Sequence, residues 1–318
     1  MKNRTYTFTK GIGLTAFLIV VAIACKQTNS PGKETKTTTT EFLTLTHKLG
    51  EVAIAKDSKK VVALDYAALE NLDQLGIPVV GMAKSHVPQY LSKYEDSDTI
   101  ADLGTIFEVD YEKLSELAPD VIFISARMLK NYDELSKIAP TVYLDSEQGK
   151  ELESLQHNLG VFGAIFNKKE AANTIFNSIK SSVVQLKDTV TGMNKNALIV
   201  MHNNGKFSAF GKASRFGIIH NLFGFNEAQE GLDTARHGQA ISNEFIQKVN
   251  PDYLFIVDRS AVVNKTATNK EAIENVLIQQ TNAFKNGKII YLDPEAWYLS
   301  GDGATSFGIM VNEVKENF

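Results

Sequence analysis

The chain has 318 residues, of which 43% are hydrophobic and 22% are charged, so it is long enough for two domains of ordinary size. Its formal charge at pH 7 is −4. The first 24 residues hold three positive charges and no negative charge, and without them the formal charge is −7. This acidic balance argues against a nucleic-acid partner. The chain has one cysteine, which excludes a disulfide within it.

The N-terminus is typical of a secretory signal peptide over residues 1–24. Basic residues in the first ten positions precede a weakly polar to apolar run, Gly11 to Ala24, that is too short to span a bilayer. The run ends in Ala22-Ile23-Ala24-Cys25, which resembles a bacterial lipobox, although Ala22 stands where Leu is commoner. We expect Cys25 to be lipidated and residues 25–42 to form a polar, flexible tether at a membrane. The alternative is that Cys25 is an ordinary buried thiol.

The rest of the chain predicts an α/β fold. Short β-branched runs alternate with helical patterns, and the predicted strands cover residues 60–64, 78–81, 121–125, 141–144, 197–201, 253–257 and 289–292. The predicted shorter helices cover residues 66–75, 111–117, 132–138, 216–223 and 243–249. A long helical pattern with few breakers spans residues 169–194. We therefore expect two Rossmann-like lobes with mainly parallel sheets, residues 43–168 and 195–318, joined by this helix.

One pattern occurs in both predicted lobes. Residues 114–127, Leu-Ser-Glu-Leu-Ala-Pro-Asp-Val-Ile-Phe-Ile-Ser-Ala-Arg, have a counterpart in residues 245–259, Phe-Ile-Gln-Lys-Val-Asn-Pro-Asp-Tyr-Leu-Phe-Ile-Val-Asp-Arg. Both copies read as a helix, a Pro-Asp turn, an apolar strand and an arginine just past the strand. Open α/β sheets bind ligands at the carboxyl ends of their strands. The strand ends of the two lobes are therefore expected to face a common cleft.

Arginine is rare after residue 24, and lysine is common. The four arginines are Arg127, Arg215, Arg236 and Arg259. Arg127 and Arg259 follow predicted strands, and the other two lie in turn-like stretches. Because the chain uses lysine where charge alone suffices, arginine indicates positions that need a planar, permanently charged fork. The alternative is that each arginine caps a carbonyl or pairs with a carboxylate.

Two further side chains are candidate metal ligands. His237 follows Arg236, and Tyr298 follows Trp297, the only tryptophan, after the last predicted strand. Imidazole and phenolate are reasonable ligands for ferric iron, so His237 and Tyr298 could converge on a metal in the cleft. Taken alone, an aromatic residue beside a loop more often packs in the core or at a rim, and a lone histidine is equally uninformative.

Several motifs, in this order, resemble those of the siderophore-binding lipoproteins of ABC importers, the class III periplasmic binding proteins. They are VVALD…LENLDQLG (61–76), PDVIFISAR (119–127), FSAFGKASRFGIIH (207–220), HGQAIS (237–242), PDYLFIVDR (251–259) and IIYLDPEAWYLSG (289–301). The resemblance covers essentially everything after residue 45, and it is closest to the petrobactin-type catecholate binders.

The resemblance implies a ligand site. Arg127, Arg215 and Arg259 would form a cationic triad for the anionic ligand, and His237 and Tyr298 would complete iron coordination when a siderophore offers too few donors. A ferric tris-catecholate carries a net charge of about minus three, which three guanidinium groups neutralise while they hydrogen-bond its oxygens. The ferric siderophore is the transported ligand, and no intrinsic cofactor is expected. The role of Arg236 is left open.

The resemblance also implies partners. In this family an acidic residue on each lobe meets arginines of the membrane permease. Glu70 fits the position on the first lobe and Glu244 the position on the second, where Glu227 is the second choice. Alternatively, Glu244 is simply a solvated carboxylate on a helix. We expect a monomeric body, anchored by lipid to a bacterial membrane in the cell envelope.

Three other functions are less favoured. A heme or corrinoid binder on the same scaffold stays open, because His237 and Tyr298 could ligate either group and the arginines could meet propionates. A zinc binder needs several convergent ligands, whereas the six histidines are scattered at positions 47, 86, 157, 202, 220 and 237. An enzyme is disfavoured because the chain has no phosphate-binding glycine motif, no Gly-x-Ser-x-Gly and no free nucleophilic cysteine once Cys25 is acylated.

Overall fold

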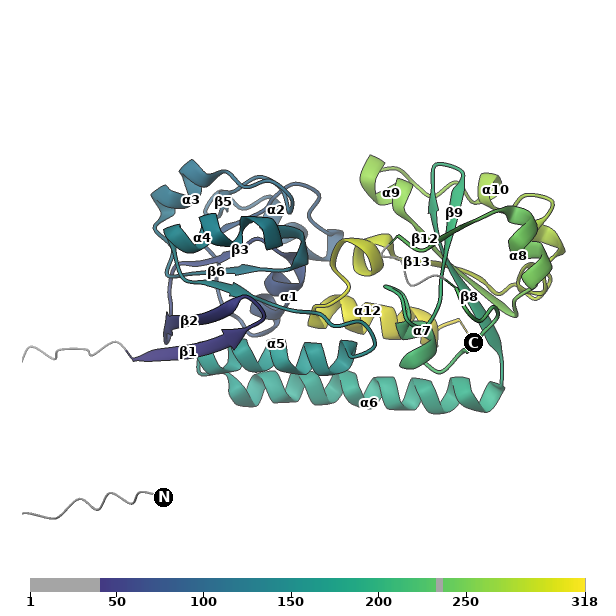
Figure 1. Ribbon diagram of the computed structural model, residues 1–318, viewed down its shortest axis with the longest axis horizontal. Coiled ribbons are helices and arrows are strands. Elements are labelled where there is room, and N and C mark those ends of the chain that lie inside the picture. The colour runs from purple at the N-terminus through teal and green to yellow at the C-terminus, as the bar shows by residue number, and fades with distance from the viewer. Residues whose placement is uncertain (1–40, 233–236, 318) are drawn as a thin grey trace, which may run out of the picture. The chain divides into compact units, whose positions relative to one another are not determined.

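Two large β-sheets, each with helices around it, organise the part of the chain that the structure describes (Figure 1). The computed structural model describes residues 41–232 and 237–317. The predicted signal peptide, Cys25, almost all of the tether, and Arg236 lie outside these ranges. The architecture is α/β, with two lobes joined by one long helix, so the predicted fold class is confirmed.

The first lobe contains a five-stranded sheet in the order β5-β4-β3-β6-β7, and all of its strand pairs are parallel. Its strands are β3 (Val61–Ala63), β4 (Gly81–Met82), β5 (Ala101–Asp102), β6 (Val121–Ile124) and β7 (Thr141–Tyr143). Every residue of β3 and β6 is buried, which explains why both strands are apolar throughout instead of alternating. An antiparallel hairpin of β1 (Phe42–His47) and β2 (Gly50–Ala55) precedes the sheet.

Short helices connect these strands. They are α1 (Tyr66–Gln74), η1 (Gln89–Leu91), α2 (Ser92–Glu95), α3 (Tyr111–Leu117), η2 (Ala126–Asn131) and α4 (Tyr132–Ile138). Aspartates cap two of them: Asp65 accepts a hydrogen bond from the Ala68 amide in α1, and Asp110 accepts one from the Lys113 amide in α3. The first cap lies directly after β3, so it sets the direction in which α1 leaves the sheet.

Two long helices lie along one side of the lobes. They are α5 (Glu151–Ile165) and α6 (Lys169–Met193), which pack against each other. The 25 residues of α6 span about 37 Å at 1.5 Å per residue. In Figure 1, α6 runs from beneath the first lobe to beneath the second. It ends at Asn194, which adopts the left-handed conformation that terminates many helices.

The second lobe has a mixed sheet in the order β11-β9-β8-β12-β13, with β10 paired to β8. Its strands are β8 (Asn196–Asn203), β9 (Lys206–Phe210), β10 (Asn226–Glu227), β11 (Gln239–Ile241), β12 (Tyr253–Asp258) and β13 (Ile289–Leu292). Strands β8, β12 and β13 are parallel, whereas β9 pairs antiparallel with β8 and β11. Its helices are α7 (Ile218–Asn221), α8 (Asn243–Val249), α9 (Arg259–Asn264), α10 (Lys270–Ile273), η3 (Ile278–Gln280), α11 (Asn282–Lys285) and η4 (Glu295–Ser300).

The last helix, α12 (Ala304–Lys315), returns from the second lobe and packs against α1 of the first. Glu70 of α1 fixes this contact. Its Oε2 accepts hydrogen bonds from the Ser306 amide at 2.7 Å and the Ser306 hydroxyl at 2.8 Å, and its Oε1 accepts one from the Tyr90 hydroxyl at 2.9 Å. A carboxylate at a helix N-terminus is favoured by the helix dipole.

The prediction that Glu70 docks the permease is wrong. Glu70 is 0% exposed, and both of its oxygens are bound inside the protein, so it offers no surface to a partner. The sequence pattern placed a helix correctly at this point, but Glu70 lies on the buried face of that helix, beneath the N-terminus of α12.

We expect the folded protein to lose stability as the pH rises from 4.5 to about 7. Burial raises the pKa of Glu70 from its usual 4.5 to about 7, against the hydrogen bonds that favour its carboxylate. Over this window the unfolded chain has released the proton that the folded chain still holds, so unfolding becomes more favourable. The stabilisation is complete below pH 4.5. At about 1.4 kcal/mol per pKa unit, Glu70 contributes on the order of 3 kcal/mol to this change.

Glu70→Gln should therefore reduce the slope of unfolding free energy against pH, measured by urea denaturation between pH 4.5 and 8. Glu116→Gln, at an exposed position of α3, is the matched control and should keep the wild-type slope. A Glu70→Gln protein with the wild-type slope would contradict the assignment.

Candidate ligand-binding cleft

A cleft of about 820 Å³ lies between the two lobes. Its walls come from the end of β6, the start of α5, the β8–β9 hairpin, the end of β12 and the turn η4. Both lobes therefore present the carboxyl ends of their central strands to it, as open α/β sheets do at their binding sites. The volume is in the usual range for a small-molecule site.

Three arginines converge on Tyr298 in this cleft. The carbonyl oxygen of Tyr298 accepts hydrogen bonds from Nη2 of Arg127 at 2.8 Å and from Nη2 of Arg215 at 2.5 Å. The Tyr298 hydroxyl accepts a hydrogen bond from Nε of Arg259 at 2.8 Å. The guanidinium carbons of Arg215 and Arg259 also lie 4.6 Å and 5.5 Å from the centre of the Tyr298 ring. Tyr298 of η4 thus contacts guanidinium groups from both lobes.

Arg127 and Arg259 occupy matching places in the two lobes. Arg127 follows β6 in the first lobe, and Arg259 follows β12 in the second. Each arginine lies at the cleft because the buried strand before it, β6 or β12, ends there. Nη1 of Arg259 also donates to the side-chain oxygen of Asn203 at 3.0 Å. The repeated sequence pattern thus places two guanidinium groups on opposite walls.

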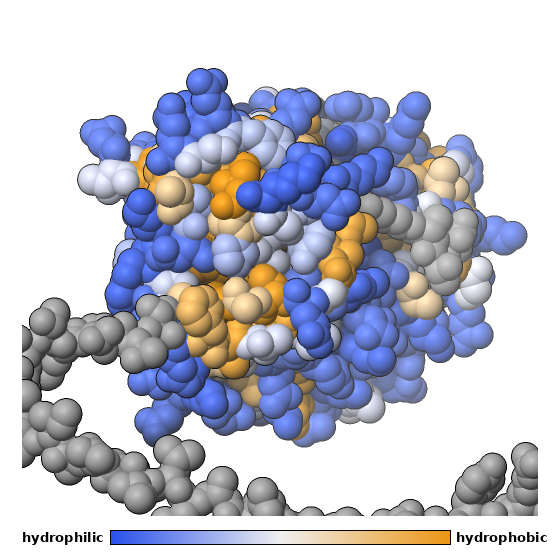
Figure 2. All heavy atoms as spheres, turned by 60° about the vertical axis from the view of Figure 1, so that its left-hand side comes forward, coloured by the Kyte–Doolittle hydropathy of each residue, from blue (hydrophilic) through white to orange (hydrophobic). Residues whose placement is uncertain are grey.

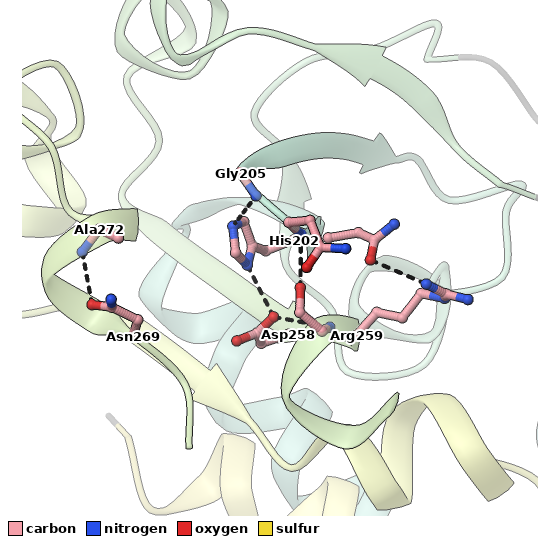
Figure 3. A network of polar contacts seen from close by, with 9 residues as sticks. His202, Gly205, Asp258, Arg259, Asn269 and Ala272 are labelled. Carbon is pink, nitrogen blue, oxygen red and sulfur yellow. Dashed lines mark hydrogen bonds and ion pairs between the residues drawn. The ribbon is translucent and has the colours of Figure 1, made fainter. Parts of the chain in front are cut away.

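A polar network lies next to Arg259 (Figure 3). Nδ1 of His202 lies 2.9 Å from Oδ1 of Asp258, and the Gly205 amide donates to Nε2 of His202 at 3.0 Å. Since Nε2 accepts a hydrogen bond, Nδ1 is the nitrogen that donates to Asp258. Asp258 also caps α9 through the Ser260 amide at 3.1 Å. The ends of β8 and β12 are joined in this way beside Arg259.

The turn η4 is a π-helix, a conformation that is rare and concentrated at functional sites. Within it, Nε1 of Trp297 donates to Oε2 of Glu313 at 2.7 Å, and the amide of Asp293, just before the turn, donates to Oε1 of Glu313 at 2.8 Å. Burial raises the pKa of Glu313 to about 7. The Trp297 ring is 2% exposed, so η4 has one side fixed in the core while Tyr298 reaches the cleft.

Comparisons with known proteins identify the family of this chain. A family model described as periplasmic binding protein matches residues 61–296. The chain belongs to this family. The petrobactin-binding protein YclQ of Bacillus subtilis is 41% identical over 309 residues, which cover 96% of each chain. The ferric-anguibactin-binding protein FatB of Vibrio anguillarum is 36% identical over 313 residues, which cover 94% of this chain and 97% of FatB.

Solved structures agree with this assignment. The crystal structure of YclQ matches with a TM-score of 0.84 and 43% identity, covering 87% of this chain and 98% of YclQ. The siderophore-binding protein BauB, bound to a complex between two molecules of acinetobactin and ferric iron, matches with a TM-score of 0.83 and 38% identity over the same shares. These relatives are binding proteins, which confirms the prediction that the chain is not an enzyme.

The cleft of this periplasmic binding protein also has an acidic side, which the sequence analysis missed. Asp302 lines the cleft, and its Oδ1 accepts a hydrogen bond from the Ser146 hydroxyl of the first lobe at 2.7 Å. Burial raises the pKa of Asp302, while the Ser146 hydrogen bond and the charges of Arg215 and Arg127 act in the opposite direction. Asp302 lies four residues after Tyr298, so its position next to the aromatic motif was the only sequence signal available.

The other predicted site residues are His237, Glu244 and Glu227. His237 lines the cleft and is exposed, and among the described residues no hydrogen bond or ring contact joins it to Tyr298. Glu244 is exposed in the first turn of α8, and a hydrogen bond from Ser242 lowers its pKa. Glu227 is held inward, because its Oε1 accepts a hydrogen bond from the Lys212 amide at 2.9 Å.

Two features are absent from residues 41–232 and 237–317. Across these ranges, His, Asp and Glu side chains do not gather in threes or more as a metal site would require. In the same ranges, no helix combines the length and the apolarity that crossing a bilayer requires.

Proposed function

We propose that this protein is the lipid-anchored substrate-binding component of an ABC importer, and that it captures a ferric catecholate siderophore of the petrobactin type. The convergence of Arg127, Arg215 and Arg259 on one residue of a cleft between two lobes carries the proposal. The names of two relatives at 41% and 36% identity, which refer to petrobactin and ferric anguibactin, support the ligand class.

The charge of the ligand fits the cleft. A ferric tris-catecholate has a net charge of about minus three, and the triad supplies three permanent positive charges. Each guanidinium has five N–H donors, and the bonds to Tyr298 and Asn203 use only part of them. In the proposed complex, N–H groups of Arg127 and Arg259 donate to catecholate oxygens. The acidic surface elsewhere keeps unspecific anion binding low.

Ferric catecholates should quench the fluorescence of the body, residues 26–318, at nanomolar concentration. Trp297 is the only tryptophan and adjoins Tyr298, so an absorbing ligand in the cleft lies close to it. Arg127→Ala and Arg259→Ala should each weaken binding at least tenfold, because each leaves part of the ligand charge unpaired. Lys248→Ala, at an exposed position outside the cleft, is the control.

The same titration tests the proposed iron ligands. With a ferric complex that leaves iron sites open, Tyr298→Phe should remove a phenolate-to-iron absorption band, and His237→Ala should weaken binding, whereas a hexadentate catecholate complex should be insensitive to both. Ferric hydroxamates should not bind. Tight binding of hemin without any response to catecholates would favour the heme or corrinoid alternative and overturn the ligand assignment.

Because Glu70 is buried, we propose Glu112 as the first-lobe residue that docks the permease, with Glu244 on the second lobe. The two residues are equivalent in the repeated pattern, eight positions before Asp120 and Asp252 respectively. Each is exposed in the first turn of its helix, α3 or α8, directly after the capped N-terminus. The pair therefore presents one carboxylate on each lobe in equivalent surroundings.

Charge-reversal variants distinguish docking to the permease from binding of the siderophore. Glu112→Arg and Glu244→Arg should leave siderophore affinity unchanged, because neither residue lines the cleft, but each should lower transport and stimulation of the importer's ATPase at least tenfold. Glu116→Arg, on the same helix as Glu112, is the control. Normal transport by both charge-reversal variants would reject this pair.

We also propose that Cys25 carries the lipid anchor, since it follows small residues at the end of the apolar run. The N-terminal peptide of the membrane-extracted protein should begin at Cys25 and carry the mass of a diacylglyceryl thioether, measured by mass spectrometry. A free Cys25 thiol that reacts with maleimide in the mature protein would count against lipidation.

A further inference from the structure

The first-lobe wall of the cleft carries an exposed aromatic ring. Phe107 is 61% exposed, although large aromatic side chains dominate the cores of proteins, and it lines the cleft opposite the second lobe. Its neighbour Ile106 is 4% exposed and packs in the core of the first lobe. The chain therefore presents Phe107 to the cleft while the adjacent residue anchors the loop.

The loop that carries Phe107 is internally braced. The hydroxyl oxygen of Thr105 accepts hydrogen bonds from the amides of Phe107 at 3.0 Å and Glu108 at 2.9 Å. The Thr105 amide in turn donates to the Glu108 carbonyl at 2.9 Å. Gly104 has φ +96°, and a Cβ there would lie 2.7 Å from that same carbonyl, so the turn needs glycine. The backbone at Phe107 is thus fixed before any ligand arrives, which limits the entropy that the loop loses on binding.

Phe107 also lies next to one member of the arginine triad. The guanidinium carbon of Arg127 is 6.0 Å from the centre of the Phe107 ring. A catecholate oxygen that accepts a hydrogen bond from Arg127 brings its own ring to the same part of the wall. Aromatic rings pack with their centres about 4.5–7 Å apart, and a catechol ring bound at Arg127 lies within reach of the Phe107 ring. The cation and the ring together form a surface for a planar anionic group.

We propose that Phe107 is a platform for an aromatic ring of the ligand, and that it selects aryl iron chelates whose oxygens are bound by Arg127. This inference rests on the proposed function and names the part of the cleft that receives a catechol ring. The platform distinguishes ligands by shape and aromaticity, whereas the arginines respond to charge.

The test measures the affinity of the purified body, residues 26–318, for the ferric complex of 2,3-dihydroxybenzoate by fluorescence quenching. Phe107→Ala and Phe107→Leu should weaken binding roughly tenfold, because both remove the ring, whereas Phe107→Tyr should stay within about threefold of wild type. Phe42→Ala is the control, since Phe42 is 64% exposed but does not line the cleft. Thermal unfolding verifies that each variant is folded.

The outcomes separate this inference from the function on which it rests. Wild-type affinity in Phe107→Ala overturns the platform and leaves the proposed function standing. Wild-type affinity in Phe107→Leu, with a loss in Phe107→Ala, overturns the aromatic selection, because any apolar side chain would then serve. A wild-type protein that does not bind the ferric catecholate overturns the proposed function, and the platform with it.

Discussion

The site depends on the way in which Tyr298 holds three like charges together. Guanidinium groups repel each other, and the repulsion strengthens where water is excluded. Here one carbonyl oxygen accepts hydrogen bonds from Arg127 and Arg215, and the phenol ring and hydroxyl of the same residue meet Arg259. Asp302 also lines the cleft, and burial raises the pKa of its carboxyl group. The three guanidinium groups are thus held together at Tyr298, and under the proposed function an anionic ligand would complete their neutralisation.

The position of Tyr298 is fixed in turn by two buried carboxyl groups. Glu313 holds the start of η4 through the Asp293 amide and the Trp297 indole, and Glu70 holds the start of α12 just beyond its end. Glu295, within the turn, also accepts a hydrogen bond from the Gln89 amide of the first lobe at 2.6 Å. Burying carboxyl groups is costly, which the raised pKa values of Glu70 and Glu313 express. Both of these unfavourable burials lie next to η4, the segment that carries Tyr298 into the cleft.

The sequence predicted the arginines better than the carboxylates, for a physical reason. Arg127 and Arg259 follow apolar strands in a repeated pattern, and strand ends have a defined location in an α/β fold, so their convergence could be expected. Glu70 was misplaced because a helix of nine residues has two faces and the pattern did not show that a second helix, α12, covers one of them. The predicted helix at 216–223 is shorter, Ile218–Asn221, and the residues before it form a turn in which the Gly217 amide donates to the Ser214 carbonyl. The exposure of Phe107 could not be predicted, since an apolar residue in a loop normally turns inward.

The packing of α12 against the first lobe affects how the chain folds. The amides of Ala304 and Ser306 bind Asn71 and Glu70, more than 230 positions earlier in the chain. Until the last turns of the chain are available, α1 lacks its partner and Glu70 has no helix N-terminus to meet. Such distant contacts slow folding, because the entropy of closing a long loop must be overcome first. The first lobe therefore completes its packing only after α12 has formed, so the folding of the first lobe is tied to that of the second.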